Sequence, residues 1–215
     1  MRRQEETLQA LYERLLAHFG PQHWWPGESA FEVVIGAILT QNTNWKNVEK
    51  ALANLKEAGL FDLSALSGLA APDLAELIRP AGYYNIKAGR LHNLFTHVNG
   101  HYEGSLDMFF ALPTRELREE LLSIKGVGPE TADAILLYAA KKPIFVVDAY
   151  TYRILLRHNL ISEDCDYYQM QALFMDSFAE DIDFYGEYHA LLVRTGNTFC
   201  KKSNPLCETC PLNGL

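Results

Sequence analysis

Apolar and polar positions repeat along most of the chain at intervals of three and four residues, which is the spacing of amphipathic α-helices. No segment of any length alternates apolar with polar residues, so the pattern predicts no β-strands. Ser29 precedes a stretch through Thr40 that is apolar on almost every side, and this stretch is expected to form a capped, central helix. The pattern predicts an all-α fold, with helices over residues 7–18, 30–40, 45–58, 72–78, 84–98, 114–124, 129–140, 148–157, 167–180 and 184–198.

Residues 121–133, with the sequence LLSIKGVGPETAD, place two glycines between two helical segments. Gly126 and Gly128 permit a tight turn because glycine accepts positive φ, and Pro129 suits the first position of a helix. Such a turn directs backbone N–H groups and the positive end of a helix outward, an arrangement that binds phosphate. An ordinary corner between two helices is the alternative. Asp148, which ends the apolar run FVV shortly after the turn, favours a functional hairpin.

The segment LLSIKGVGPETADAILLYA, followed by VVDAYTYRIL, resembles the helix-hairpin-helix and catalytic aspartate of the endonuclease III superfamily of DNA glycosylases. The resemblance implies an all-α fold of two lobes. A six-helix domain over 28–138 would contain the hairpin at 121–133, and residues 1–27 and 139–215 would form a second helical domain. DNA would bind between the lobes, with a monovalent cation at the hairpin. The residues that would contact the DNA backbone are Lys125, Gly126, Val127 and Gly128.

The same resemblance assigns the chemistry to Asp148. Breaking an N-glycosidic bond builds positive charge on the sugar, which an ionised carboxylate stabilises while it orients the attacking water. A plain helix N-cap is the alternative role for Asp148, and the two roles are compatible. Superfamily members that also cleave the strand carry a lysine just after the turn. Here that position is Glu130, which cannot form a Schiff base, so the sequence predicts a monofunctional glycosylase.

The three tryptophans, Trp24, Trp25 and Trp45, lie on either side of the central apolar helix. Core packing is the usual role of tryptophan. However, Trp24 and Trp25 lie in a loop and Trp45 follows one, so their rings are candidates for the walls of a cleft. Electron-rich rings favour a flipped base that carries positive charge, as N-alkylated purines do.

The segments WWP, QNT followed by a tryptophan, and RPAGYYNIK resemble the 3-methyladenine DNA glycosylases of the same superfamily. This resemblance implies an alkylated purine such as 3-methyladenine as substrate, and a base pocket lined by Trp24, Trp25, Pro26 and Trp45. It also implies that Gln41 fills the gap left by the flipped base and that Tyr83 wedges the opposite strand. The alternatives are a helix C-cap region for Gln41 and a half-buried aromatic for Tyr83.

Cys200, Cys207 and Cys210 have the spacing C-x6-C-x2-C, which favours a metal over a disulfide. Endonuclease III relatives bind a [4Fe–4S] cluster with C-x6-C-x2-C-x5-C, so the resemblance implies such a cluster in the complete protein. The fourth cysteine would fall one position after Leu215. A decayed site, another fourth ligand or a zinc ion are the alternatives. Cys165 is expected to be a free surface thiol. The cysteine loop at 200–210 is a departure from the 3-methyladenine branch, whose known member has no such loop.

The amino-acid composition limits the classes of molecule that the protein is expected to bind. The chain of 215 residues is 48% hydrophobic and 21% charged, with a net charge of −8, which argues against broad binding of polyanions. Binding to DNA depends on the local field, so it is not excluded. Nine basic residues are candidates for that field or are solvated surface charges, namely Lys87, Arg90, Lys125, Lys141, Lys142, Arg153, Arg157, Lys201 and Lys202.

No signal peptide or membrane-spanning apolar run is evident. The sequence therefore predicts a cytoplasmic, nucleoid-associated monomer that repairs double-stranded DNA containing a damaged base. Two alternative functions stay open at this point. One is an endonuclease III-like glycosylase with AP-lyase activity on oxidised pyrimidines, and the other is a non-catalytic helix-hairpin-helix DNA-binding protein.

Overall fold

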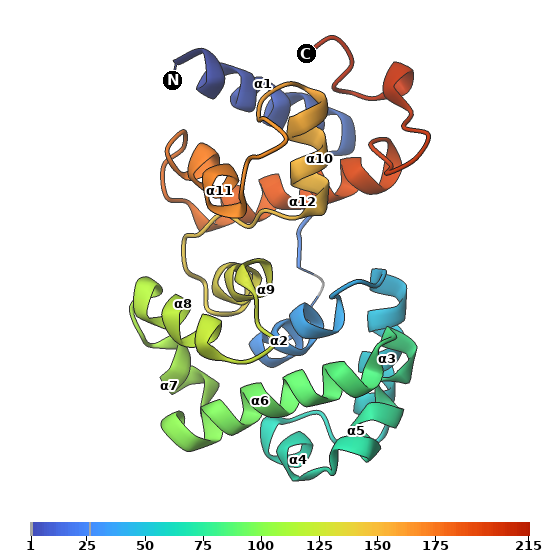
Figure 1. The fold of residues 1–215 in the computed structure, drawn as a ribbon, viewed down its shortest axis with the longest axis vertical. Helices are drawn as coiled ribbons and strands as arrows, with labels where there is room; N and C mark the ends of the chain where they lie inside the picture. The colour runs from blue at the N-terminus through green and yellow to red at the C-terminus, as the bar shows by residue number, and fades with distance from the viewer. Residues whose placement is uncertain (1, 26) are drawn as a thin grey trace. The chain divides into compact units, whose positions relative to one another are not determined.

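The computed structural model describes residues 2–25 and 27–215, and within these ranges it contains helices and no strand (Figure 1). The predicted all-α fold is confirmed. The α-helices are α1 (Arg2–Phe19), α2 (Ala30–Leu39), α3 (Trp45–Glu57), α4 (Leu63–Gly68), α5 (Ala71–Leu77), α6 (Tyr84–Tyr102), α7 (Leu106–Phe110), α8 (Thr114–Ser123), α9 (Pro129–Ala134), α10 (Ala149–Arg157), α11 (Tyr167–Met175) and α12 (Ile182–Thr198). Short helical turns are η1 (Arg79–Ala81), the π-helical η2 (Ile135–Ala139) and η3 (Cys207–Thr209).

The structure differs from the predicted helices in several places. Helices α4 and α7, of six and five residues, were not predicted, because so short a segment shows no clear period. Asp62 and Ser105 cap them through side-chain hydrogen bonds to backbone N–H groups. The predicted helix over 129–140 consists of α9 followed by the π-helical turn η2, and α11 ends before 180.

The chain divides into two compact units, one formed by Gly27–Lys141 and the other by Met1–Pro26 with Lys142–Leu215. In the first unit, α2 is central. Its residues from Glu32 to Leu39 are buried, and it packs against α3, α6, α9 and η2. Ser29 caps α2 as predicted, since its Oγ accepts the N–H of Glu32 at 3.2 Å. The long helix α6 packs against α2, α4, α5 and α7 (Figure 1).

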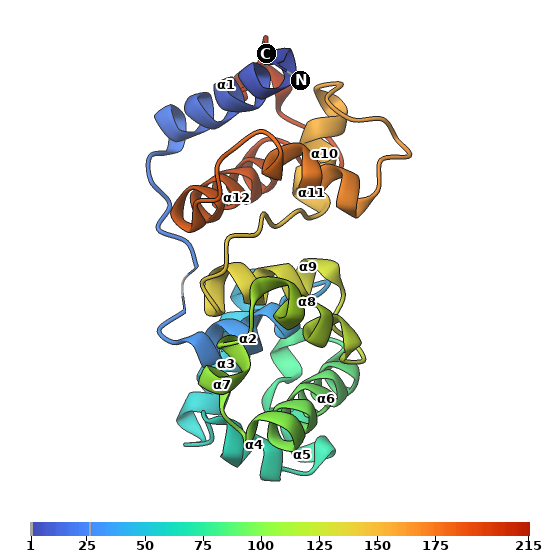
Figure 2. The same cartoon turned by 90° about the vertical axis from the view of Figure 1, so that its left-hand side faces the viewer.

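In the second unit, α12 packs against α10 and α1 (Figure 2). Its core is rich in aromatic rings. Phe145 and Phe174 stack with centroids 3.9 Å apart, and the hydroxyl of the fully buried Tyr188 donates to the carbonyl of Leu8 at 2.7 Å. Gln171 donates from Nε2 to the carbonyl of Phe145 at 2.7 Å, which fixes the buried segment leading to Asp148. No helix in the described parts of the chain is long and apolar enough to cross a membrane.

Candidate active site

Asp148 lies at the N-terminus of α10, directly after a buried apolar segment. Its Oδ1 accepts two hydrogen bonds from Thr151, one from the backbone N–H at 2.7 Å and one from the hydroxyl at 2.9 Å. The N-cap predicted as the alternative for Asp148 is therefore present. Two donors from a single buried residue fix the orientation of the carboxylate.

The other carboxylate oxygen faces a histidine from α12. His189 Nε2 lies 3.6 Å from Asp148 Oδ2, and the two side chains are only 7% and 9% exposed. Burial raises the pKa of Asp148, but the imidazole of His189 and the two hydrogen bonds from Thr151 outweigh burial and lower that pKa below its ordinary value. The site thus holds an ionised carboxylate at neutral pH. Sequence reasoning missed His189, and its only signal was a lone histidine within the apolar positions of α12.

The hairpin between α8 and α9 requires glycine more strictly at position 126 than at position 128. Gly126 has a φ of 102°, and a Cβ there would lie 2.4 Å from Cγ of Arg90. Gly128 has a φ of −95°, so the expectation of positive φ holds only for Gly126. Lys125 and Gly128 are exposed. The side chain of Val127 is buried and its N–H donates to the carbonyl of Ile124 at 3.0 Å, so that amide is already used within the turn.

An ion pair with a fully buried carboxylate braces the two hairpin helices. Arg118 on α8 donates from Nε and Nη2 to the two carboxylate oxygens of Asp133 on α9, at 2.7 and 2.9 Å. The side chain of Asp133 is 0% exposed. This bidentate geometry holds the turn in one orientation.

Gln41 contacts the hairpin directly. Its Nε2 donates to the carbonyl of Gly126 at 3.2 Å and to Oγ1 of Thr131 at 2.9 Å, and its Oε1 accepts a hydrogen bond from Nη1 of Arg90. The helix C-cap itself is Thr40. To enter a DNA duplex, the Gln41 side chain would have to exchange these hydrogen bonds for new ones.

Tyr83 and Lys87 differ from the sequence-based expectations in opposite directions. Tyr83 is 68% exposed with a φ of 47°, so it is not half-buried. Lys87 is 1% exposed, so it is not a solvated surface charge. Its Nζ donates to the carbonyls of Leu39 and Ala81, both at 2.8 Å, and burial lowers its pKa to about 8, with Arg90 adding to the effect.

The tryptophans fall in different units. Trp24 and Trp25 are half-buried in the unit that contains Asp148, and their rings meet edge to face with centroids 5.8 Å apart. Trp45 is the first residue of α3 in the other unit and is also half-buried. Pro26, the remaining residue of the expected base pocket, lies outside the described residues.

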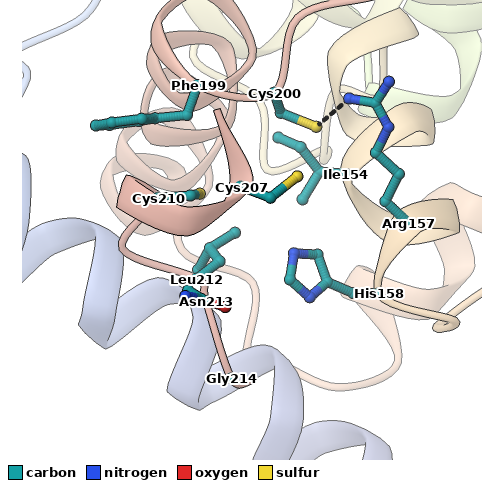
Figure 3. Close-up of a pocket in the computed structure, with 10 residues that line it drawn as sticks. All are labelled: Ile154, Arg157, His158, Phe199, Cys200, Cys207, Cys210, Leu212, Asn213 and Gly214. Atoms are coloured by element: carbon teal, nitrogen blue, oxygen red, sulfur yellow. Dashed lines mark hydrogen bonds between the residues drawn. The ribbon is translucent and has the colours of Figure 1, made fainter. Parts of the chain in front are cut away.

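Cys200, Cys207 and Cys210 line one pocket with a volume of about 160 Å³, together with His158 (Figure 3). Sγ of Cys200 accepts a hydrogen bond from Nη1 of Arg157 at 3.1 Å. Three thiols around one space are a donor set that suits an iron–sulfur cluster or zinc. Within the described residues, however, no group of three or more cysteine, histidine or acidic side chains is arranged to hold a metal ion. Cys165 is a free thiol, half-buried rather than fully at the surface.

Comparison with known proteins identifies the family. Residues 35–180 match the model of the HhH-GPD superfamily base excision DNA repair protein family. A protein of Methanocaldococcus jannaschii, whose name assigns it DNA repair glycosylase activity, is 46% identical over 208 residues, which are 96% of this chain and 94% of that protein.

Two solved structures are similar as well. The H. pylori 3-methyladenine DNA glycosylase bound to 1,N6-ethenoadenine is 33% identical, with a TM-score of 0.77 over 90% of this chain and 97% of that chain. An endonuclease III trapped as a covalent intermediate with DNA is 22% identical and shares the fold, with a TM-score of 0.83 over 97% of this chain and 93% of that chain. The resemblance to the endonuclease III superfamily and its 3-methyladenine branch is thereby confirmed. The chain belongs to the HhH-GPD superfamily and is a base-excision-repair DNA glycosylase.

Proposed function

We propose that this glycosylase hydrolyses the N-glycosidic bond of an alkylated purine such as 3-methyladenine in double-stranded DNA, as a monomer and without cleaving the strand. The observation that carries the proposal is the carboxylate of Asp148, buried, oriented by Thr151 and kept ionised beside His189. A fixed anion stabilises the positive charge that develops on the sugar as the bond breaks. Asp148 is accordingly the catalytic residue of the proposal, and it orients the attacking water.

The residue after the hairpin turn supports hydrolysis alone. Glu130 occupies the position at which strand-cleaving relatives have a lysine, and a carboxylate cannot form a Schiff base with the sugar. Lys125 lies exposed on the other side of the turn, where a positive charge suits a phosphate contact. Strand cleavage through a lysine at position 130 is therefore not part of the proposed mechanism.

The tryptophans assigned to the proposed base pocket suit the proposed substrate class. Trp24, Trp25 and Trp45 are all half-buried, so each has surface left for a ligand, and Pro26 completes the proposed set. The electron-rich face of indole binds a cationic base better than a neutral one. The similar H. pylori protein is named as a 3-methyladenine glycosylase and binds a modified adenine, 1,N6-ethenoadenine. An alkylated purine is already a good leaving group, so one carboxylate suffices.

The DNA-binding part of the proposal assigns residues 28–138 as the six-helix domain. Its hairpin residues Lys125, Gly126, Val127 and Gly128 would contact the DNA backbone, through a monovalent cation where backbone carbonyls face the phosphate. Tyr83 would wedge the duplex, and its exposure suits that role. Gln41 would fill the gap left by the flipped base.

Cys200, Cys207 and Cys210 are proposed as ligands of a [4Fe–4S] cluster. When bound, such a cluster would order the loop over 200–210. The three thiols line one pocket, which supports the assignment (Figure 3). Iron and acid-labile sulfide, measured in protein purified without oxygen, test it. Serine at the three positions should abolish both, while serine at Cys165 should change neither.

The decisive experiment is base release from duplex DNA containing 3-methyladenine or thymine glycol, by wild type and Asp148→Asn. Asparagine is also a good N-cap, so the variant is expected to fold. Asp62→Asn, at the N-cap of α4, is the matched control. Release of 3-methyladenine without strand cleavage, lost only in Asp148→Asn, supports the proposal. Cleavage at thymine glycol with a borohydride-trapped adduct would instead indicate an endonuclease III-like enzyme. If no variant releases a base and all of them bind damaged DNA as wild type does, the protein is a DNA-binding module.

A further inference from the structure

We propose that three side chains of α6, Lys87, Arg90 and Asn93, form one polar stripe that fixes the relative positions of three DNA-contacting segments. These segments are the loop with Gln41, the turn with Tyr83 and the hairpin over 125–128. The inference rests on the proposed function, which assigns those segments to DNA. The three stripe residues are positioning residues, since each acts through a segment that it holds.

Lys87 joins the first two segments. Its buried ammonium group donates to the carbonyl of Leu39 and to that of Ala81, both at 2.8 Å. Each carbonyl precedes a proposed DNA contact by two residues, Gln41 in one case and Tyr83 in the other. Burying an ammonium group is costly unless its donors are satisfied, so both loops are held where their carbonyls reach Nζ.

Arg90 and Asn93 continue the stripe to the hairpin. Nη1 of Arg90 donates to Oε1 of Gln41, and the stem of Arg90 lies where a Cβ on residue 126 would be. Asn93 donates from Nδ2 to the carbonyl of Lys125 at 2.8 Å. Residues spaced by three are neighbours on a helix surface, and from 87 to 93 the stripe rises about 9 Å along α6.

The helix that carries the stripe is itself fixed in the core of its unit. Five apolar residues of α6 are fully or almost fully buried, namely Ala88, Leu91, Leu94, Phe95 and Val98. The three segments are distant from one another in the sequence, yet each is hydrogen-bonded to this one helix. Ordering the segments before DNA arrives lowers the conformational cost of binding. At the exposed Asn93, the stripe should therefore affect DNA affinity more strongly than it affects folding.

Asn93→Leu is the sharpest test, because Asn93 is exposed and uncharged. Its matched control is Asn99→Leu on the same helix, where Nδ2 of another exposed asparagine donates to Oγ of Ser67 at 3.1 Å, away from the three segments. Lys87→Met and Arg90→Met complete the set. The probe is a duplex containing a tetrahydrofuran abasic-site analogue, compared with the undamaged duplex, and each variant's thermal midpoint is measured beside its dissociation constant.

The three stripe variants are expected to bind the abasic duplex at least tenfold more weakly than wild type, while Asn99→Leu binds as wild type does. Asn93→Leu should do so without changing the salt dependence of binding, which separates positioning from a lost phosphate contact. The inference would be overturned if Asn93→Leu and Asn99→Leu bind the abasic duplex with equal affinity. It would also be overturned if the loss of affinity follows the fall in thermal midpoint in all variants. A wild type that does not distinguish the two duplexes would overturn the proposed function, and this inference with it.

Discussion

Lys87 should make the stability of this protein rise with pH in the mildly alkaline range. Its side chain is 1% exposed, and burial lowers its pKa to about 8 from the ordinary value of 10.5. Between these two values the unfolded chain binds more protons than the folded one does. Raising the pH therefore favours the folded state, and the stabilisation grows until the unfolded lysine also loses its proton.

The gap between the folded and unfolded pKa values of Lys87 corresponds to about 3.4 kcal/mol of unfolding free energy. About 1.3 kcal/mol of this gain falls between pH 7 and pH 9. The Lys87→Met variant has no titrating group at this position, so that part of the rise should disappear. It should also be less stable at every pH, because the carbonyls of Leu39 and Ala81 lose their donor, at about 1–3 kcal/mol each.

Urea unfolding of wild type and Lys87→Met at pH 7, 8 and 9 measures this difference. Subtracting the two curves removes the contributions of other groups that titrate in the alkaline range, such as Cys210, whose pKa is raised by burial. Lys50→Met, at an exposed lysine, is the matched control and should keep the wild-type pH dependence. The reasoning would be refuted if wild type and Lys87→Met gain the same free energy of unfolding between pH 7 and pH 9. Lys87 would then stay charged in the folded protein.

Three further changes test the hairpin and the carboxylate. Asp133→Ala removes the buried partner of Arg118 and should lower the free energy of unfolding by about 3–5 kcal/mol in urea, whereas a loss under about 1 kcal/mol would mean that the pair behaves as a surface one. Gly126→Ala should weaken binding to the abasic duplex, because a φ of 102° disfavours a side chain, and an unchanged dissociation constant would contradict this. His189→Gln should move the acid limb of base release to higher pH, since the imidazole helps to keep the pKa of Asp148 low, and an unmoved limb would exclude that role.

The features that could be predicted from the sequence are those with local causes. Helical spacing located the long helices, and the capping preferences of Ser29 and Asp148 placed them at helix N-termini, where the structure has them. The resemblance carried by the hairpin gave the superfamily. Helices α4 and α7 span six and five residues and left no periodic signal.

Polar groups inside the fold could not be predicted, because their partners are distant in the sequence. The sequence pattern predicts Lys87 and Arg90 as surface charges. In the structure, Lys87 donates to the carbonyl of Leu39 on α2, and Arg90 donates to Gln41 in the loop after α2. His189 meets Asp148 only because α12 packs on α10. Nothing in the local pattern around any of these residues distinguishes such an internal role from a solvated one.

The same observations bear on how a chain with a net charge of −8 binds DNA. Of the nine basic residues considered as sources of a positive field, Lys87 is buried and Arg90 is bound to Gln41. Arg153 and Arg157 donate to backbone carbonyls in the cysteine loop, at 2.6 and 2.8 Å. These side chains hold the protein's own loops through hydrogen bonds to neutral acceptors, and they keep their positive charge. Under the proposed function, we therefore expect recognition of DNA to depend on preformed segment geometry as well as on charge. We expect such a surface to discriminate by its fit to distorted DNA, which the comparison of abasic and undamaged duplexes measures.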